Sequence, residues 1–499
     1  MSRGRRAGVL LPVFSLPGDW GIGCLSRDAE RFVAQLAEAG QSIWQMLPIG
    51  PTGYGDSPYQ SFSTFAGNPN FIDLDDLVDQ GLLAKGELLE LHWGDDPTRV
   101  DYGAVSTARD RALRLAHSRL GRLDDEPDYQ RFVVDQADWL EGYALFMTIK
   151  SGQELREWTQ WPDELRHREP QALGRVRDLD AAEFEYQRWL QWQFHRQWQR
   201  LRAFMRDAGV QVLGDLPIYV AMDSADAWAN PELFDLDDDL RPRELAGVPP
   251  DGFSPGGQLW GNPLYDWPAH KATGFAWWIR RLSRQFELFD TLRLDHFRGL
   301  ESYYAVPYGD PDARDGLWRP GPGLDFFDRI SAALGRLPMV AEDLGFLTDA
   351  VRVLRETANL PGMQVIQFAF DGREHSDYWP HNFVRDTVVY TGTHDNPPLQ
   401  QWWVTLSAAD RERARTYLNS WWTPPDQVHW DFIIAALTSI ADTCIVPMPD
   451  YLGLGAEGRI NTPSTNSGNW SWRMHADAFT PALVKRMARL AYLTQRSDS

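Results

Sequence analysis

The chain has few of the residues on which several kinds of chemistry depend. Among its 499 residues the cysteines are Cys24 and Cys444, too few and too far apart for a disulfide framework or a zinc site. No lysine lies in a segment considered below as part of a site, which argues against Schiff-base catalysis. The lysines are Lys85, Lys150, Lys271 and Lys485. Such scarcity of cysteine is typical of a reducing compartment, and we expect a cytoplasmic protein.

Excess basic charge and long apolar runs are also missing. The 49 Lys and Arg residues face 70 Asp and Glu, which gives a formal net charge of -21. Such a chain repels phosphate backbones and anionic lipids, so we expect neither nucleic acid nor membrane as a partner. No apolar run approaches the roughly 20 residues that span a bilayer. Residues 7–11 imitate a signal peptide after basic residues, but Pro12 and Pro17 interrupt the stretch, and we interpret it as the first strand.

Aromatic residues, in contrast, are abundant. The chain contains 23 Trp, 24 Phe and 16 Tyr residues, and most large rings are expected in the core. Trp260, Trp470 and Trp472, however, stand among glycine, asparagine and proline, in sequence typical of loops. Flat rings in such loops can stack against the apolar faces of pyranose sugars.

Amphipathic stretches alternate with short apolar runs along the chain. The segments 27–39, 182–208, 324–334 and 348–358 have helical periodicity, and a glycine follows each of them, as is usual after a last helical turn. This alternation predicts a parallel α/β sheet, and eight strands predict a (β/α)8 TIM barrel. The expected strands are 9–13, 42–48, 210–215, 291–295, 339–342, 363–368, 388–392 and 444–448.

Two connections are too long to be simple loops. We expect one catalytic barrel over residues 1–499, with both long connections inserted at the C-terminal face of the strands. Residues 51–181 have helical patterns near 106–120 and 127–149, which predict a mostly helical subdomain. Residues 218–275 are rich in proline, glycine and aspartate, which predicts an irregular lobe over the cleft.

Three acidic residues, Asp295, Glu342 and Asp395, each come at or just after an expected strand. Burying an unpaired charge is costly, so these carboxylates are poor core residues. Parallel strands place their C-terminal ends at one edge, which predicts that the three side chains share a polar cleft. Cleaving a glycosidic bond with retention requires a nucleophilic carboxylate and a carboxylic acid, and this trio can supply both.

Neighbouring residues favour different protonation states for the carboxylates. Arg293 precedes Asp295 by two residues, shares its strand face, and is expected to lower its pKa. Burial and the adjacent Asp343 are expected to raise the pKa of Glu342. His394, next to Asp395, is suited to hold sugar hydroxyl groups.

Two short motifs suggest other chemistries but lack the required context. Gly252-Phe-Ser254-Pro-Gly256 fits the pattern of serine hydrolases, yet prolines and glycines on both sides predict a loop where a strand and helix are needed. Residues 453–458 fit a dinucleotide-binding fingerprint, but no helix is expected after them. His296 and His394 lack the spacing of a metal site. We therefore expect no metal and no cofactor.

Seven segments, spread almost end to end, carry a resemblance to a known family. They are GYGDSPY (53–59), GDLPIYV (214–220), GQLWGNP (257–263), LRLDHFRG (292–299), AEDLG (341–345), GTHDN (392–396) and GLGAEGR (453–459). With these segments the chain resembles glycoside hydrolase family 77, the 4-α-glucanotransferases or amylomaltases. The resemblance implies a retaining hexosyltransferase that moves α-1,4-glucan segments between maltooligosaccharides by double displacement.

The resemblance also implies residue roles. Asp295 would be the nucleophile, Glu342 the acid/base and Asp395 the stabiliser of the transition state. The residues implied to bind substrate are Arg293, His394, Asp215 and Tyr59 around the reacting sugar, Gln258 and Trp260 on a mobile loop, and Tyr54, with Tyr102 a second candidate, in a secondary glucan groove. Ser464 and Ser467 depart from the family pattern in segment 461–469.

Two alternatives share the same substrate class. One is an α-glucan hydrolase that uses the same carboxylates, and the other is a glucan-binding protein without activity. Transfer requires the acceptor side of the cleft to exclude water, and the tryptophan-bearing loop 253–263 is a candidate lid for this task.

Overall fold

The computed structural model describes residues 4–121, 123, 126–250, 254–345, 347–370, 377–465 and 467–497. Its centre is an eight-stranded parallel sheet in the order β10-β11-β12-β1-β2-β3-β6-β9. The strands are β1 Arg6–Leu10, β2 Ile43–Gln45, β3 Gln211–Leu216, β6 Thr291–Leu294, β9 Met339–Ala341, β10 Gly362–Val365, β11 Thr387–Tyr390 and β12 Thr443–Pro447. Every expected strand is present, and the predicted barrel is confirmed.

The two outer strands of this order, β9 and β10, nearly close the sheet into a barrel. The N–H of Ala341 donates to the carbonyl of Pro361 over 2.9 Å. Asp343, just beyond β9, accepts from the N–H of Met363 in β10 over 2.8 Å and pairs with Arg355. A side-chain bridge therefore supplements a short backbone ladder at the closure.

The first strand begins earlier than its apolar run indicates. β1 pairs with β12 from Arg6 to Leu10 and with β2 from Gly8 to Leu10. Pro12 has no N–H to donate to a ladder, and a 3-10 turn follows at Val13–Ser15. Residues 7–10, which imitate a signal peptide, thus form a central strand of the barrel.

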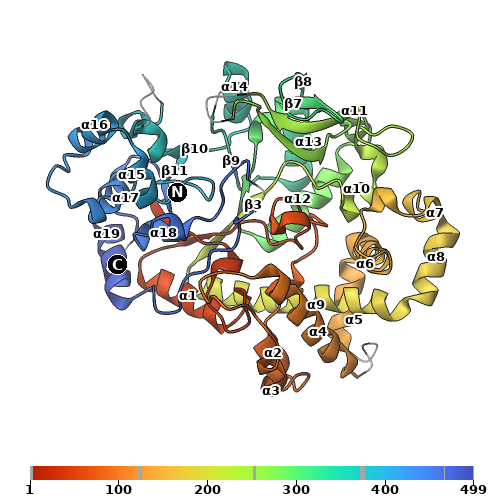
Figure 1. Ribbon diagram of the computed structural model, residues 1–499. Coiled ribbons are helices and arrows are strands. Elements are labelled where there is room, and N and C mark those ends of the chain that lie inside the picture. The colour runs from red at the N-terminus through yellow and green to blue at the C-terminus, as the bar shows by residue number, and fades with distance from the viewer. Residues whose placement is uncertain are drawn as a thin grey trace.

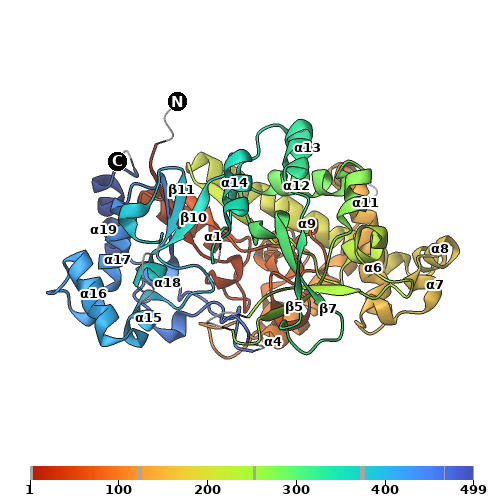
Figure 2. The ribbon, with the colours of Figure 1, turned by 90° about the horizontal axis from the view of Figure 1, so that it is seen from above.

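Helices surround the barrel, as Figures 1 and 2 show. Helix α1 is typical: Ser26 caps its first turn, Phe32, Val33 and Leu36 are buried, and Gly40 follows with a φ of 68°. The other helices that follow barrel strands, directly or after long connections, are α9 Ala181–Asp207, α12 Ala276–Leu288, α13 Leu324–Leu334, α14 Asp349–Thr357, α15 Leu399–Thr405, α16 Ala408–Leu418, α17 His429–Thr438, α18 Met448–Tyr451 and α19 Pro481–Leu493, and α1 itself is Arg27–Glu38.

The long connection between β2 and α9 is helical. Its helices are α2 Leu74–Asp79, α3 Lys85–Leu89, α4 Tyr102–Ser118, α5 Pro127–Asp135, α6 Ala137–Gly152, α7 Asp163–Arg166 and α8 Pro170–Leu179. The pattern over 127–149 is two helices, because the chain leaves helical geometry at Gln136 (φ -109°, ψ 11°). Helices α6, α7 and α8 project to one side of the barrel in both ribbon views.

A second, antiparallel sheet was not foreseen from the sequence. Its order is β5-β4-β7-β8, and its strands are β4 Glu244–Val248, β5 Gln258–Pro263, β7 Ser302–Pro307 and β8 Leu317–Pro320. The expectation of an irregular lobe over 218–275 is therefore wrong, because this segment contains β4, β5, α10 Ala225–Ala229 and α11 Trp267–Ala272. Its strands are completed by β7 and β8, which lie distant in sequence and could not be paired from local pattern.

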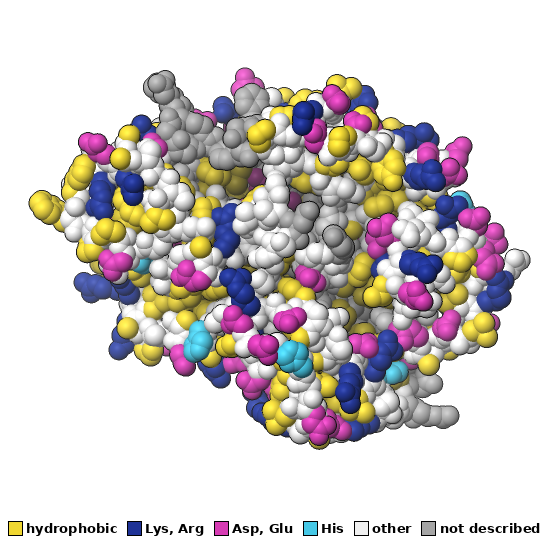
Figure 3. Space-filling view, viewed as in Figure 1, with side chains coloured by type: hydrophobic (Ala, Val, Ile, Leu, Met, Phe, Trp, Pro, Cys, Tyr) yellow, Lys and Arg dark blue, Asp and Glu magenta, His cyan; other side chains and the backbone are white. Residues whose placement is uncertain are grey.

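Charges of both signs are mixed on one face of the molecule. Figure 3 shows acidic and basic side chains spread over the face that it displays. None of the helices among the described residues is long and apolar enough to cross a membrane.

Gly8 gives a test of barrel packing. A Cβ there would lie 2.5 Å from the carbonyl oxygen of Ile43 and 2.7 Å from Cδ1 of Ile445. We expect Gly8→Ala to lower the free energy of unfolding by about 1–3 kcal/mol, as overpacking does, and to lower the thermal midpoint in calorimetry. Gly174 in α8 has open space around it, so Gly174→Ala is the control and should raise stability by about 0.4–1 kcal/mol. Equal midpoints for the two variants would contradict this account.

Candidate active site

The three carboxylates lie beyond the C-terminal ends of the barrel strands β6, β9 and β11, of which β6 and β9 are neighbours. Asp295 follows β6 directly, Glu342 follows β9 directly, and Asp395 stands in the loop after β11. The side chains of Asp295 and Asp395 are 28% and 41% exposed, so both are open to a ligand. A network of hydrogen bonds and ion pairs joins Asp295 and Asp395 to four other side chains, those of Tyr59, Asp215, Arg293 and His394.

Arg293 is the buried cation of this network. Its Nη1 lies 2.7 Å from Oδ1 of Asp215 and 2.8 Å from Oδ1 of Asp295. Burial alone would lower the pKa of Arg293, but the adjacent carboxylates of Asp215 and Asp295 raise it well above its ordinary value. The guanidinium is thus permanently charged and fixes the direction of Asp295.

Tyr59 connects Asp215 to His394. Its hydroxyl donates to Oδ2 of Asp215 over 2.8 Å and lies 2.9 Å from Nε2 of His394. Burial and the charge of Asp215 raise the pKa of Tyr59 well above its ordinary value, so the phenol keeps its proton. Because that proton is directed at Asp215, Nε2 of His394 is the donor in the second contact. The two rings stack with centroids 5.3 Å apart.

Glu342 is in a different environment. Its carboxylate accepts from the N–H of His296 over 2.8 Å and from the N–H of Leu344 over 3.2 Å. Burial raises the pKa of Glu342 to about 7; Arg293 opposes this rise and the charge of Asp295 adds to it. The expectation that Asp343 supplies the like charge is wrong, since Asp343 is directed at Arg355 and Met363.

His296 was not foreseen as part of the site. Its φ of 50° is left-handed, which is rare for a residue other than glycine, and its N–H points at Glu342. Its ring meets the ring of Trp260 edge to face at 4.9 Å, and burial lowers its pKa to about 4. A neutral imidazole therefore separates Trp260 from the carboxylate pair. In the sequence, the position of His296 next to Asp295 was the only sign that it belongs to the site, because its left-handed backbone conformation cannot be deduced from the sequence.

Asp395 is held by the segment after the last barrel strand. Nδ2 of Asn461 donates to its Oδ1 over 2.6 Å, and Nη2 of Arg459 donates to its backbone carbonyl over 2.8 Å. Nε2 of His394 lies 3.4 Å from its Oδ2. Asn461 and Arg459 were not assigned a role, although both lie in or next to segments that we singled out.

Gln258 and Trp260 lie on one face of β5, two residues apart. Nε1 of Trp260 donates to Oε1 of Gln258 over 3.1 Å. Gln60 donates to the carbonyl of Trp260 over 3.2 Å and to the side chain of Asn262 over 3.1 Å, which links β5 to the loop that carries Tyr59. Both residues are partly buried, and the ring of Trp260 contacts that of His296, the residue after Asp295.

Two of the tryptophans expected in open loops are buried in the structure. Trp470 and Trp472 are 6% and 4% exposed, so they are packed and not open platforms. Trp470 lies against Tyr59 and His394, with centroid distances of 5.8 and 6.0 Å. The hydroxyl of Tyr102 donates to the carbonyl of Trp470 over 2.8 Å. Tyr54 belongs to a 3-10 turn, and its side chain lies outside the described residues.

The rival motifs gain no support from their surroundings. Ser254 donates to the carbonyl of Gly257 over 2.6 Å within a turn, and the residues before it lie outside the described ones. Residues 453–458 form a turn and a 3-10 segment without a following helix. Across the described ranges, no group of three His, Cys, Asp or Glu could hold a metal ion.

Residues 11–479 match the family described as 4-alpha-glucanotransferase, glycoside hydrolase family 77. The chain belongs to this family. It is 41% identical to a 4-alpha-glucanotransferase of Clostridium butyricum, over 97% of this chain and 100% of the relative. It is 42% identical to that of Thermus thermophilus, over 99% of each chain.

The fold agrees with this membership. The amylomaltase from Streptococcus agalactiae, solved in complex with acarbose, superimposes with a TM-score of 0.96 at 36% identity. The match covers 99% of this chain and 100% of that one. The membership assigns the chain to the enzymes.

The raised pKa of Glu342 predicts a pH-dependent cost to stability. In the native state the carboxyl of Glu342 keeps its proton up to about pH 7. In the unfolded state, where a glutamate has its ordinary pKa of 4.5, the proton is lost above that pH. Stability contributed by the neutral carboxyl is therefore full below pH 4.5 and is lost as the pH rises to 7. We expect Glu342→Gln, which cannot ionise, to gain thermal midpoint relative to wild type from pH 4.5 to pH 8. The exposed Glu412→Gln is the control, and a pH-independent difference for Glu342→Gln would contradict the prediction.

Tyr59→Phe should separate positioning from packing. The variant keeps the stacked ring but removes the donor to Asp215 and the acceptor for His394. We expect turnover of a short maltooligosaccharide to fall by up to about 100-fold, the loss that a small misplacement of reacting groups can cause, and the thermal midpoint to fall as well, because Asp215 loses a buried donor. Tyr304→Phe is the control, because its hydroxyl binds the carbonyl of Ala313 outside the carboxylate network. Equal rates for the two variants would remove Tyr59 from the mechanism.

Proposed function

We propose that the protein transfers α-1,4-glucan segments between maltooligosaccharides by a retaining double displacement. The observation that carries the proposal is the contrast between two adjacent carboxylates. Asp295 contacts the guanidinium of Arg293, whereas Glu342 is partly buried and accepts from backbone donors, with its pKa raised to about 7. One ionised and one protonated carboxyl are what this chemistry requires.

In the first step a carboxylate oxygen of Asp295 attacks the anomeric carbon of the donor sugar. The bond from that carbon to the glycosidic oxygen breaks, and Glu342 gives its proton to the departing oxygen. A glycosyl ester on Asp295 and a shortened glucan result. In the second step the ionised Glu342 takes a proton from the hydroxyl of an acceptor glucan, whose oxygen displaces Asp295.

The surrounding residues stabilise the charge that develops on the sugar ring. Asp395, held by Asn461, offers a carboxylate to the positively charged ring and to its hydroxyl groups. Asp215, Arg293, Tyr59 and His394 form a fixed polar surface beside it. Because their orientations are set before substrate binds, little reorganisation accompanies the reaction.

Transfer prevails over hydrolysis when a sugar hydroxyl reaches the ester before water does. We infer that β4, β5 and their neighbours cover the acceptor side, with Trp260 and Gln258 toward the carboxylates. The edge-to-face contact between Trp260 and His296 supports this placement. An apolar wall there disfavours ordered water and offers a ring for a glucose unit to stack on.

The proposal extends to the place of action. Cys24 and Cys444 are both free and buried, which is compatible with a reducing cytoplasm. The α-1,4-glucans that the protein uses would then be intracellular maltooligosaccharides or storage glucans.

Incubation with maltotriose tests the reaction. Transfer yields glucose and longer maltooligosaccharides with no net gain of reducing ends, to be followed by chromatography and a reducing-end assay. A steady rise in reducing ends would instead identify a hydrolase, and unchanged maltotriose would identify a binding protein.

Two substitutions assign the roles in the same assay. Asp295→Asn removes the nucleophile and Glu342→Gln removes the titrating proton, and we expect each to abolish turnover. Asp325→Asn is the matched control, because Asp325, on α13, is an exposed carboxylate paired with Lys271. Rates near wild type for either site variant would overturn the assignment.

A further inference from the structure

Two tryptophans are exposed together in a short turn between α16 and α17. Trp421 is 50% exposed and Trp422 is 95% exposed. Large apolar side chains cost free energy in water, so two adjacent ones on a surface indicate a contact made with something else. The helices α15, α16 and α17, which carry and flank this turn, lie together at one edge of the molecule (Figure 1).

The turn is held in place and does not hang free. Nη1 of Arg415 donates to the carbonyl of Ser420 over 2.6 Å and to that of Thr423 over 3.1 Å. The N–H of Thr423 donates back to the carbonyl of Ser420 over 3.2 Å. The guanidinium of Arg415 also lies over the ring of Trp403, 5.3 Å from its centroid. Both tryptophans therefore belong to a turn whose backbone is fixed by hydrogen bonds.

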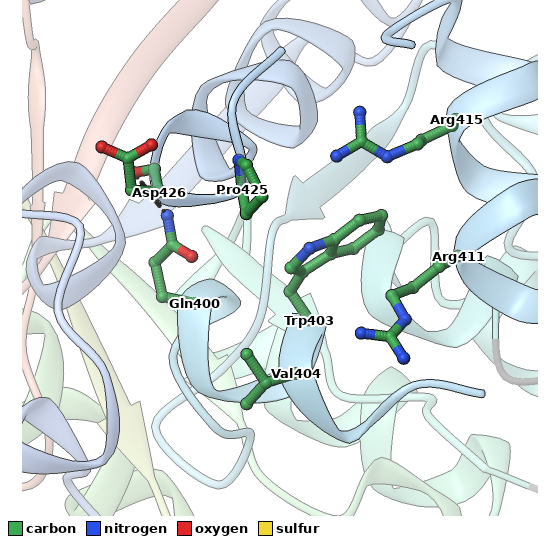
Figure 4. Close-up of a pocket in the computed structure, with 7 residues that line it drawn as sticks. All are labelled: Gln400, Trp403, Val404, Arg411, Arg415, Pro425 and Asp426. Atoms are coloured by element: carbon green, nitrogen blue, oxygen red, sulfur yellow. Dashed lines mark hydrogen bonds between the residues drawn. The ribbon is translucent and has the colours of Figure 1, made fainter. Parts of the chain in front are cut away.

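The residues that brace the turn also line a surface cleft. It is drawn in Figure 4, where Trp403 lies between the two arginines on one side and Gln400 and Pro425 on the other. Its volume is about 420 Å³, within the range of small-molecule sites. The lining residues are Gln400, Trp403, Val404, Arg411, Arg415, Pro425 and Asp426. Since Pro425 follows the turn closely, the exposed tryptophans stand next to the cleft.

The cleft offers both a donor and an acceptor beside its rings. Within the described part of the chain, the hydrogen bond of Arg411 is that of its backbone N–H to Ser407, and its guanidinium makes no hydrogen bond and no ion pair. Asp426 is exposed and uses its backbone carbonyl, not its carboxylate, to accept from Gln400. Sugar hydroxyls both donate and accept, so they match this pair. An anion would be attracted to Arg411 but repelled by the carboxylate of Asp426 and by the net charge of -21.

We propose that Trp421, Trp422 and this cleft form a second binding site for α-1,4-glucan, separate from the carboxylates. The choice of glucan rests on the proposed function. The indole rings stack on the apolar faces of successive glucose units, while Arg411 and Asp426 bind their hydroxyl groups.

Its position gives the site a role. Helix α15 begins at Leu399, shortly after Asp395, and carries Gln400, Trp403 and Val404. Its seven residues rise about 10 Å at 1.5 Å each. A long glucan held in the cleft is thereby kept near the carboxylates at a raised effective concentration. Maltotriose is too short to use both sites, so only long substrates benefit.

The test is the double variant Trp421→Ala/Trp422→Ala, assayed on maltotriose and on amylose. We expect KM for amylose to rise about three- to tenfold, the factor for one aromatic contact, with kcat and both constants for maltotriose unchanged. Electrophoresis in gels containing amylopectin should show wild type retarded more than the variant. Arg411→Met, which keeps the stem but removes the donors, should give the same pattern with a smaller rise.

Tyr492→Ala is the matched control, because Tyr492 is a 59% exposed aromatic on α19. An unchanged KM for amylose would overturn the second site, and so would equal losses on both substrates, which indicate an effect on the carboxylates. Sedimentation of wild type as a dimer that the double variant abolishes would also overturn it, since the turn then binds a second copy. Failure of the proposed function is distinguishable: a wild-type protein that binds amylopectin but leaves maltotriose unchanged refutes transfer and leaves this site standing.

Discussion

The ion pairs of Arg293 are the interaction on which the site depends. A buried guanidinium needs carboxylate partners, and Asp215 on the neighbouring strand and Asp295 at the end of its own strand provide them. Removing Arg293 would leave the buried carboxylate of Asp215 without its cation, which is far costlier than losing an exposed pair. The cation also acts at a distance, since it opposes the rise of the pKa of Glu342. One buried side chain thus contacts Asp295 directly and also lowers the pKa of Glu342.

Around this centre, parts that lie far apart in the chain supply single contacts. Tyr59 comes from the loop after β2, His296 from the turn after β6, and Asn461 from the segment after β12. The second sheet brings Trp260 to His296. The barrel makes this possible because its strands end at one face, whatever the lengths of the connections between them. The surface cleft beside α15 is positioned in the same way, since the helix that follows Asp395 also carries Trp403.

The barrel could be predicted because its signals are local. Each strand is a short apolar run, and the ends of the predicted helices are marked by nearby residues with positive φ, namely Gly40, Gly209, Gly335 and Asn359. The second sheet could not be predicted, because β4 pairs with β7, which lies far along the chain beyond the barrel strand β6, and because β8 is exposed and has no apolar pattern. The packed positions of Trp470 and Trp472 were hidden for a related reason, as their loop-like sequence says nothing of what folds over them.

For the site, the sequence by itself determined the chemistry: three carboxylates at strand ends, an arginine on the strand face of Asp295, and motifs that fit the 4-alpha-glucanotransferase family. The tertiary structure decided which group acts on which. Only the fold could turn Asp343 away from Glu342 toward Arg355 and β10, and direct the N–H of His296 at Glu342. The reason is physical: residue types fix which charges and protons exist, but pKa values depend on burial and on distances between atoms that only packing sets.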